Sequence, residues 1–473
     1  MRKKVLGVLL STAMVATAFT GCGGSDSTSS STTGGNTTTD TTATSGEDTS
    51  SSAATSTSEV ENVVSGDAAA EDAFVVWGWN DDIKNILDNE YKEANPDDYA
   101  RIVFVNTGGS DVYQTKIDEM LNDESNELYP DVMGLEVDYV KKYVNSDSLL
   151  SADDLGITAD DTANMYQYNK DLGTDADGKM KAFFWQATPG CYQIRADLAK
   201  KYLGTTDPAE LQDKYFSSWD NMIAAAKTVN DASKGKVKLL SGYTDVFRTF
   251  SNSRTTGWYD GDDKITIDPN MEEYMEVAKQ FYEGDLTFNT DQWTDDWNAN
   301  MEGDGKKSNA ALAYSGCPWF TYWCLKDVWK GNTILVNGPQ QFYWGGTGLS
   351  ATKGCADTEL AGRMIKWITC DVDALVAINK RSSDFVNNTE ALAQIQKSNA
   401  TCDWLFKGAK QNVIEFYLPL ADSIDASTST AEDQTINDLW ASQVKEYVQG
   451  NVDADTAIED FKASVHDTYD YLS

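Results

Sequence analysis

The stretch that decides the fold class is "AFVVWGWNDDIKNILDNEYKEANPDDYARIVFVN", residues 73–106. An apolar run opens it, a segment with apolar residues at helical spacing follows and ends before Pro96, and a second apolar run closes it. A strand, a helix and a strand in this order predict a parallel pair joined by a crossover helix. The predicted buried face of that helix consists of Ile83, Ile86, Leu87 and Tyr91.

The same alternation continues along the chain, with a predicted helix at 111–123 and a third strand in "YPDVMGLE", residues 129–136. We therefore expect an α/β protein with a mainly parallel sheet. In open α/β sheets, ligands meet the loops beyond the carboxyl ends of the strands. Trp79, Asn80 and Asp81 lie at such an end. Helix capping by the two polar side chains is equally compatible with the pattern.

The first residues resemble an export signal. Residues 1–21 combine three early basic residues with a short apolar run and small residues, as in a secretory signal peptide. The end of this segment resembles a bacterial lipobox, which implies cleavage before Cys22 and a lipid on its sulfur. Residues 22–72 are rich in Gly, Ser, Thr and Ala, so we expect a disordered tether. The prediction is a protein anchored by lipid to the extracellular face of a bacterial membrane.

Charge and composition narrow the possible partners. A formal net charge of −37 argues against nucleic acid, anionic lipid surfaces and anionic substrates, and leaves neutral or cationic ligands. A single histidine, His466, argues against Ser/His triads and multi-histidine metal sites, so we expect no metal site and no cofactor. Six cysteines follow Cys22, and disulfides and buried thiols remain equally open for them. About 400 residues predict two domains.

Tryptophan is the unusual residue of this chain, with 14 copies, several of them beside Gly, Pro or Asp. The C–H face of a pyranose ring can lie on an aromatic plane, while its hydroxyls need planar donors and acceptors such as Asp, Asn, Gln and Arg. Core packing is the competing explanation for each tryptophan. For Trp293 and Trp297, which have helical spacing in "QWTDDW", we expect packing.

Several motifs in order resemble a known family. They are "VVWGWND", "YPDVMGLEVDYVKKYVNSDSLLSADDL", "KMKAFFWQATPGCYQIRADLAKKYLG", "SWDNMIAAAKTV", "ALAYSGCPWFTYW" and "FYWGGTGLSATKGCADTELAGRMIKWI". With the lipobox and tether before them, they resemble the family 1 extracellular solute-binding proteins of carbohydrate ABC transporters. This resemblance implies a two-lobed, periplasmic-binding-protein-like (type II) α/β fold with a hinge and a ligand cleft between the lobes. The lobes it implies are 73–188 with 338–400, and 189–337 with 401–473.

The resemblance also implies a set of ligand contacts. The family's first strand-to-helix loop corresponds to Trp79, Asn80 and Asp81, and the loop after the third strand corresponds to Glu136 and Asp138. Arg248 and Trp258 lie in a segment that departs from the family pattern, where a loop whose arginines balance nearby acids is the alternative. The other predicted contacts are Trp185, Gln186, Trp319, Trp344 and Trp440.

The function that the resemblance implies is capture without catalysis. A monomer would bind a neutral carbohydrate, preferably an oligosaccharide, and deliver it to the permease subunits of an ABC transporter. A binding protein for a cationic or peptide solute is the first alternative, because the chain is acidic. A lipid-anchored glycoside hydrolase is the second, and it would need two carboxylates facing each other across a cleft.

Overall fold

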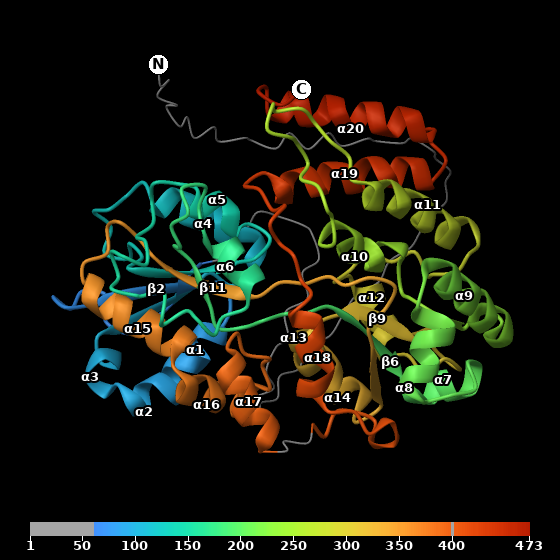
Figure 1. Cartoon of the computed structure of the whole chain (residues 1–473), viewed down its shortest axis with the longest axis horizontal. Coiled ribbons are helices and arrows are strands. Elements are labelled where there is room, and N and C mark those ends of the chain that lie inside the picture. The colour runs from blue at the N-terminus through green and yellow to red at the C-terminus, as the bar shows by residue number, and fades with distance from the viewer. Residues whose placement is uncertain (1–60, 399–401) are drawn as a thin grey trace, which may run out of the picture. The chain divides into compact units, whose positions relative to one another are not determined.

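The computed structural model describes residues 61–398 and 402–473 (Figure 1). The predicted signal peptide, Cys22 and most of the predicted tether lie outside the described residues. Within them the ordered chain begins earlier than the expected boundary at residue 73, because Val63–Ser65 form strand β1. This strand pairs antiparallel with β3 through backbone hydrogen bonds, and Val63 and Val64 stay exposed. An edge strand of this kind needs no apolar burial, which explains why composition did not indicate it.

A six-stranded sheet carries the first half of the fold, in the order β1-β3-β2-β4-β11-β5. Strand β2 runs parallel to β3 and β4, as the alternation of strands and helices predicted. Strand β11 is antiparallel to both of its neighbours, because the chain returns to this sheet from the opposite direction. The strands after β1 are β2 (Phe74–Gly78), β3 (Ile102–Asn106), β4 (Val132–Glu136), β5 (Phe183–Phe184) and β11 (Thr347–Ala351).

Helices pack on this sheet and complete a first hydrophobic core. In Figure 1, α4 and α5 lie on one side of the strands, and α1 and α15 on the other. The four residues predicted to form the buried face of the first helix are all buried, across α1 and the π-helical turn Leu87–Tyr91 that continues it. The helices of this core are α1 (Asp82–Ile86), α2 (Lys92–Ala94), α3 (Pro96–Tyr99), α4 (Ser110–Met120), α5 (Val140–Val144), α6 (Gln167–Gly173), α15 (Thr358–Cys370), α16 (Val372–Ser382), α17 (Thr389–Lys397) and α18 (Val413–Ala421).

A second hydrophobic core surrounds a three-stranded sheet, in which β6 (Cys191–Arg195) lies between β9 (Ala313–Gly316) and β10 (Thr333–Val336). The short strands β7 (Val237–Lys238) and β8 (Ala310–Ala311) pair beside it. Helix α19 packs against both α11 and α20, and in the upper part of Figure 1 it lies between them. The helices of this core are α7 (Ala196–Tyr202), α8 (Pro208–Leu211), α9 (Trp219–Ser233), α10 (Phe247–Ser251), α11 (Pro269–Glu283), α12 (Asp295–Glu302), α13 (Pro318–Phe320), α14 (Lys326–Trp329), α19 (Asp433–Val448) and α20 (Ala454–Thr468).

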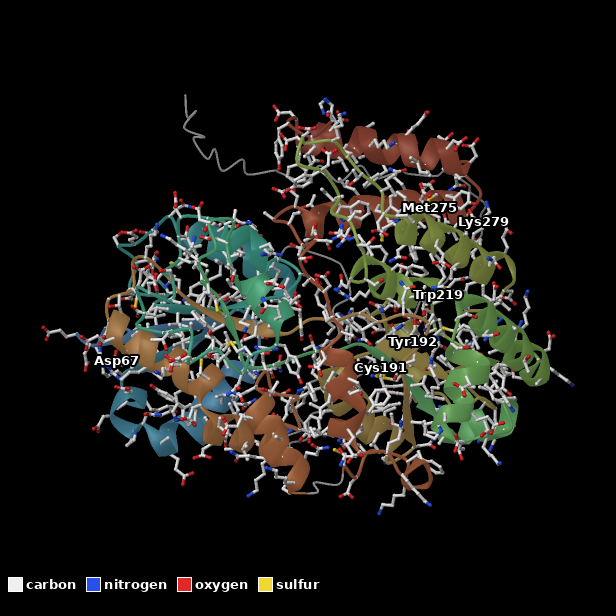
Figure 2. All side chains as sticks on the ribbon, viewed as in Figure 1. Asp67, Cys191, Tyr192, Trp219, Met275 and Lys279 are labelled. Atoms are coloured by element: carbon white, nitrogen blue, oxygen red, sulfur yellow. The ribbon has the colours of Figure 1, made fainter. Side chains whose placement is uncertain are left out.

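Two extended segments that pass between the cores pair with each other. Gly190 donates its N–H to the carbonyl of Phe342 at 2.7 Å, and Trp344 donates to the carbonyl of Thr188 at 3.1 Å. Gly190 is required here, because a Cβ at this position would lie 2.4 Å from the Phe342 ring. Cys191 already packs in the first core and its neighbour Tyr192 in the second (Figure 2), so the change of core falls between two consecutive residues.

The third passage between the cores begins near the predicted lobe boundary at residue 401 and is spread over a longer segment. Side chains of α18 pack in the first core, and Tyr417 contacts both Phe385 and the Cys191 thiol. Phe406 and Ala409 already pack against the second core before α18, and the fully buried residues of that core resume at α19.

The six cysteines after Cys22 are free thiols. In the described residues, no helix is both long and apolar enough to cross a membrane.

Candidate functional site

A cavity of about 460 Å³ lies between residues of the two cores, in the size range of small-molecule sites. The first core contributes Trp79, Asn80, Asp82, Ser110, Gln114, Glu136, Asp138, Tyr139 and Gln186. The second core and its helices contribute Arg248, Trp319, Trp344 and Gln434, and the crossing segment contributes Gly345, Gly346 and Thr347. Trp293 and Trp323 also line the cavity, with exposed rings that belong to neither core.

The loop after β2 supplies one wall, as the end of a parallel strand predicted. The Trp79 ring is held by edge-on contacts with Tyr113 at 5.2 Å and Tyr139 at 6.4 Å. Asn80 accepts the N–H of Asp82 at 2.9 Å, so this side chain shapes the start of the helix as well as lining the cavity. Asp81 does not line the cavity, because its carboxylate accepts a hydrogen bond from Asn106.

Asp82 takes the place that Asp81 was predicted to hold. It lines the cavity, and desolvation raises the pKa of its carboxyl group above the ordinary value. The sequence offers two adjacent aspartates at this helix start, and only the direction of the first turn decides which one faces the cavity. A carboxyl group in this position can accept a hydrogen bond from a ligand hydroxyl.

Two acids lie at the end of β4, where the family resemblance implied ligand contacts: Glu136 is the last residue of the strand and Asp138 follows it. Glu136 accepts the backbone N–H of Asp138 at 2.7 Å. Burial is the largest cause that raises the pKa of Glu136, to about 8, and the charge of Asp138 raises it further. Glu136 is therefore protonated at neutral pH and can donate a hydrogen bond, which an ionised carboxylate cannot.

Arg248 of α10 crosses the site from the second core to the first. Its two terminal nitrogens donate to the two carboxylate oxygens of Asp138, with an Nη1–Oδ1 distance of 2.6 Å. The guanidinium group also lies 5.2 Å from the centre of the Trp344 ring, within cation–π distance. Both Arg248 and Asp138 are about one-quarter exposed. The pair therefore joins the two sides of the cavity directly.

Tryptophans of the second core form the opposite wall. Trp319 and Trp344 meet edge to face at 5.3 Å, and Trp319 Nε1 donates to the Trp344 carbonyl at 3.1 Å. Trp293 lies 6.4 Å from Trp319 with nearly parallel planes and remains 40 % exposed. Trp323 is 48 % exposed and also faces the cavity. Exposed aromatic faces beside carboxyl and amide groups suit a ring with an apolar face and hydroxyl edges.

Trp293 corrects the expectation that it packs in a helix. Helix α12 begins only at Asp295, and Trp297 fills the core position while Trp293 precedes the helix. Trp293 also has a φ of 68°, in the left-handed region that bulky side chains rarely occupy. Holding a residue in this backbone conformation costs roughly 1–3 kcal/mol of conformational free energy. Such residues are found mainly at functional sites.

Several predicted contacts lie away from the cavity. Trp185 is fully buried in the first core, and Trp258 and Trp440 pack against each other and Phe461 in the second. Trp258 Nε1 is also bound to Asn437, at 3.0 Å. These three rings offer no free face to a ligand, because neighbouring side chains cover them.

Gln186 lines the cavity, but its amide group is engaged. It donates to Asp384 at 3.0 Å and accepts the Thr347 N–H at 3.3 Å, and so it positions the crossing segment. The predicted contacts that line the cavity are Trp79, Asn80, Glu136, Asp138, Gln186, Arg248, Trp319 and Trp344.

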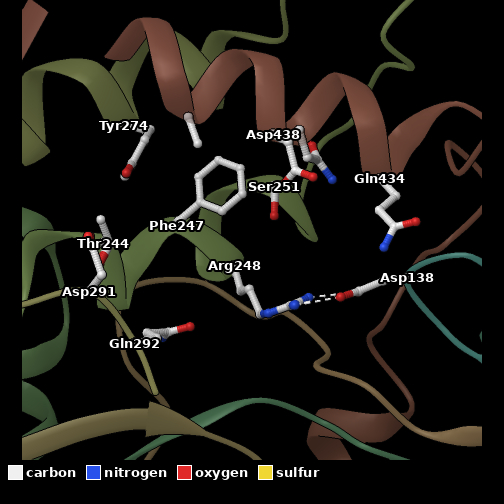
Figure 3. A pocket seen from close by; sticks show the side chains of 12 residues that line it. Asp138, Thr244, Phe247, Arg248, Ser251, Tyr274, Asp291, Gln292, Gln434 and Asp438 are labelled. Carbon is white, nitrogen blue, oxygen red and sulfur yellow. Dashed lines mark hydrogen bonds and ion pairs between the residues drawn. The ribbon is translucent and has the colours of Figure 1, made fainter. Parts of the chain in front are cut away.

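A smaller cavity of about 240 Å³ adjoins the first and shares Asp138, Arg248 and Gln434 with it. Figure 3 shows the Arg248–Asp138 pair at its edge, with Phe247 and Asp438 nearby. The residues that belong to this cavity alone come from the second core. Among the described residues, no cluster of three or more His, Cys, Asp or Glu is placed to hold a metal ion.

No protein-family model and no curated protein matches this sequence. Solved structures do match the fold. An extracellular solute-binding protein of family 1 superimposes with a TM-score of 0.70 at 18 % identity, over 82 % of this chain and 97 % of that one. The chain has the fold of the extracellular solute-binding proteins.

Other structures with this solute-binding-protein fold contain sugars. An ABC-transporter-associated binding protein from B. animalis subsp. lactis, in complex with β-1,6-galactobiose, has a TM-score of 0.66 at 17 % identity and covers 84 % of this chain and 97 % of its own. The galacto-N-biose/lacto-N-biose I-binding protein of Bifidobacterium longum, in complex with lacto-N-biose, has a TM-score of 0.66 at 14 % identity and covers 85 % and 97 %.

Proposed function

We propose that this protein is the sugar-binding component of an ABC transporter and that its ligand is a neutral oligosaccharide. The observation that carries this proposal is the larger cavity, where exposed tryptophan faces from one core meet carboxyl and amide groups from the other. Structural neighbours that hold a galactobiose and lacto-N-biose support the same ligand class. Binding of this kind requires no catalytic group.

The mechanism that we propose is closure around the ligand. The cavity walls come from two cores joined by extended segments, so a sugar that contacts both walls stabilises the state in which they are close. The closed protein then delivers its sugar to membrane permease subunits.

Isothermal titration calorimetry against a panel of oligosaccharides tests this function. The panel contains maltodextrins, β-1,6-galactobiose, lacto-N-biose and fragments of xylan and mannan. We expect at least one micromolar ligand, which corresponds to about 8 kcal/mol of binding free energy. The absence of binding to every sugar in the panel would contradict the proposal.

A cationic solute is the second candidate, because Asp82 and Asp138 line the larger cavity while Arg248 is the cation among its described lining residues. Polyamines and basic peptides in the same calorimetric panel distinguish the two ligand classes. Release of reducing ends from any oligosaccharide would instead indicate a glycoside hydrolase.

We also propose that a lipid on Cys22 anchors the protein to the extracellular face of the membrane. The lipobox-like residues before Cys22 support this location. Replacing the cysteine (Cys22→Ala) should move the protein from the membrane fraction to the medium, as followed by immunoblotting. A matched Cys355→Ala variant, which removes a thiol of the folded part, should remain with the membrane.

A further inference from the structure

The two cavities of the site are separated by polar side chains rather than by backbone. Arg248 and Asp138 line both cavities, and so does Gln434. Side chains can change rotamer without unfolding the elements that carry them, so a boundary of this kind can open. What the boundary side chains contact therefore decides how far a ligand can extend.

Two hydrogen-bonded pairs make up this boundary, and each joins the first core to the second. Arg248 of α10 holds Asp138, which follows β4, through a bidentate ion pair. Gln114 of α4 donates through Nε2 to Oε1 of Gln434 on α19 at 3.0 Å. Bidentate arginine–carboxylate pairs are directional as well as strong. The Trp344 ring, which lies against the guanidinium group of Arg248, further restricts the rotamers of that side chain.

The smaller cavity beyond the boundary has the same chemistry as the larger one. Phe247 and Tyr274 supply aromatic surface, while Gln292, Asn437 and Asp438 supply planar donors and acceptors. This combination suits one more sugar unit, as it does on the near side of the boundary. With a volume of about 240 Å³ against about 460 Å³, it is the minor compartment.

We propose that the Arg248–Asp138 pair, with Gln114–Gln434 beside it, sets the maximum length of the bound oligosaccharide. The ligand fills the larger cavity and ends against Arg248, and the smaller cavity is a further subsite that this pair closes off. A longer ligand reaches the smaller cavity only by separating the partly buried Arg248–Asp138 ion pair. The binding free energy gained from the extra contacts is therefore offset by the cost of breaking that pair. This inference rests on the proposed sugar-binding function and deepens it.

The test is calorimetry with a size series, maltose to maltohexaose and β-1,6-linked galactose oligomers from dimer to tetramer. We expect the wild type to bind the longest member no more tightly than the shortest member that fills the larger cavity. Arg248→Ala should weaken binding of the short members, because it removes a contact, yet raise the long-to-short affinity ratio by about tenfold. Gln434→Ala, a milder change at the same boundary, should raise the ratio in the same direction.

One further variant tests whether the smaller cavity causes the change in the affinity ratio, and a second serves as a control. Adding Phe247→Ala to Arg248→Ala should abolish the gain for long ligands, because it removes the aromatic surface beyond the boundary. Arg363→Ala removes another arginine–aspartate pair, with Asp98 in the first core, and should leave the ratio unchanged because neither residue lines either cavity.

The outcomes separate the two proposals. If the wild type binds no member of either series or of the wider panel, the proposed function fails and this inference fails with it. If the wild type binds sugar but Arg248→Ala and Gln434→Ala both leave the long-to-short ratio unchanged, the inference alone is overturned. A wild type that already prefers the longest ligand by about tenfold overturns it as well.

Discussion

At the scale of single residues, burial separates the tryptophans that can meet a ligand from those that stabilise the cores. Trp77 and Trp258 are both fully buried, whereas Trp319 keeps part of its ring surface at the cavity. The difference lies in what packs against each ring, and it predicts the effect of each substitution.

Replacing Trp319 by alanine should weaken sugar binding by about tenfold or more, equal to about 1.4 kcal/mol. The reason is the loss of an aromatic face at the cavity, together with the support that Trp319 gives to Trp344 through their hydrogen bond. Calorimetry with the best oligosaccharide of the panel measures the change. The matched control is Trp367→Ala, another half-buried tryptophan that lines neither cavity of the site. Equal affinities for both variants would remove Trp319 from the site.

Glu136 should make the stability of the protein depend on pH. Burial raises its pKa to about 8 in the folded protein, so the folded state holds a proton that the unfolded state releases at lower pH. The stability that Glu136 contributes is complete below its ordinary pKa and is lost as the pH rises toward 8. The groups that face it are Asp138, whose charge strengthens this effect, and Arg248, whose charge opposes it.

The variant Glu136→Gln keeps the shape of the side chain and cannot ionise. We expect thermal unfolding to show little difference from the wild type at pH 5 and a gain of up to about 4 kcal/mol at pH 8. The exposed loop residue Glu127, replaced by glutamine, controls for the loss of one negative charge. A Glu136→Gln protein that is less stable than the wild type at pH 8 would contradict the assignment of a buried, protonated carboxyl group.

At the scale of elements, the segment between β10 and β11 builds part of the cavity wall with its backbone. Gly345 has a φ of 66° and Gly346 a φ of 113°, both in the left-handed region. Thr188 on the paired segment donates its hydroxyl to the Gly345 carbonyl at 2.7 Å. Because the two crossing segments are hydrogen-bonded to each other at this point, a side chain added here would displace residues that line the cavity.

Gly345→Ala tests this arrangement. A Cβ would lie 3.1 Å from Glu136 Oε1 and 3.2 Å from Trp319 Nε1, so both ligand-facing groups must shift. We expect a stability loss of about 1 kcal/mol from the left-handed backbone and, in addition, weaker sugar binding. Gly178→Ala is the matched control, because its φ is 80° but a Cβ there meets nothing within 4 Å. Only the Gly345 variant should lose affinity when the two are compared by calorimetry.

At the scale of the whole molecule, the site exists only where the two cores meet. Trp319 packs against one core, with the exposed Trp293 beside it, whereas Glu136 ends a strand of the other core and Asp138 follows that strand. A bound sugar therefore adds contacts between cores that are otherwise connected by extended segments and a few polar pairs. We therefore expect the bound sugar to stabilise both cores together against unfolding.

Sugar at one hundred times its dissociation constant should raise the free energy of unfolding by about 2.7 kcal/mol. Thermal unfolding with increasing sugar measures this shift, and small-angle scattering should show a smaller radius of gyration in the bound state. Trp319→Ala should need about ten times more sugar for the same shift. A sugar that binds in calorimetry but leaves the unfolding temperature unchanged would contradict stabilisation across both cores.

The sequence alone determined the parts of this protein that depend on local pattern. The strand–helix–strand unit from β2 to β3, the buried face of its first helix and the parallel pairing follow from apolar spacing within about 30 residues. The position of Asn80 near a ligand site also follows, because ligands meet the loops beyond the carboxyl ends of parallel strands, whereas Glu136 and Asp138 were expected there from the family resemblance.

Only the tertiary structure decided which residues meet across the chain. Arg248 and Asp138 are 110 positions apart, and Trp258 is covered by Trp440 from a distant helix, so no local pattern could assign one to the cavity and the other to the core. The turn before α12 likewise frees Trp293 from the helix that its spacing indicated. The physical reason is that burial depends on the surfaces that pack together in three dimensions, whereas sequence periodicity reports only the face a residue occupies on its own element.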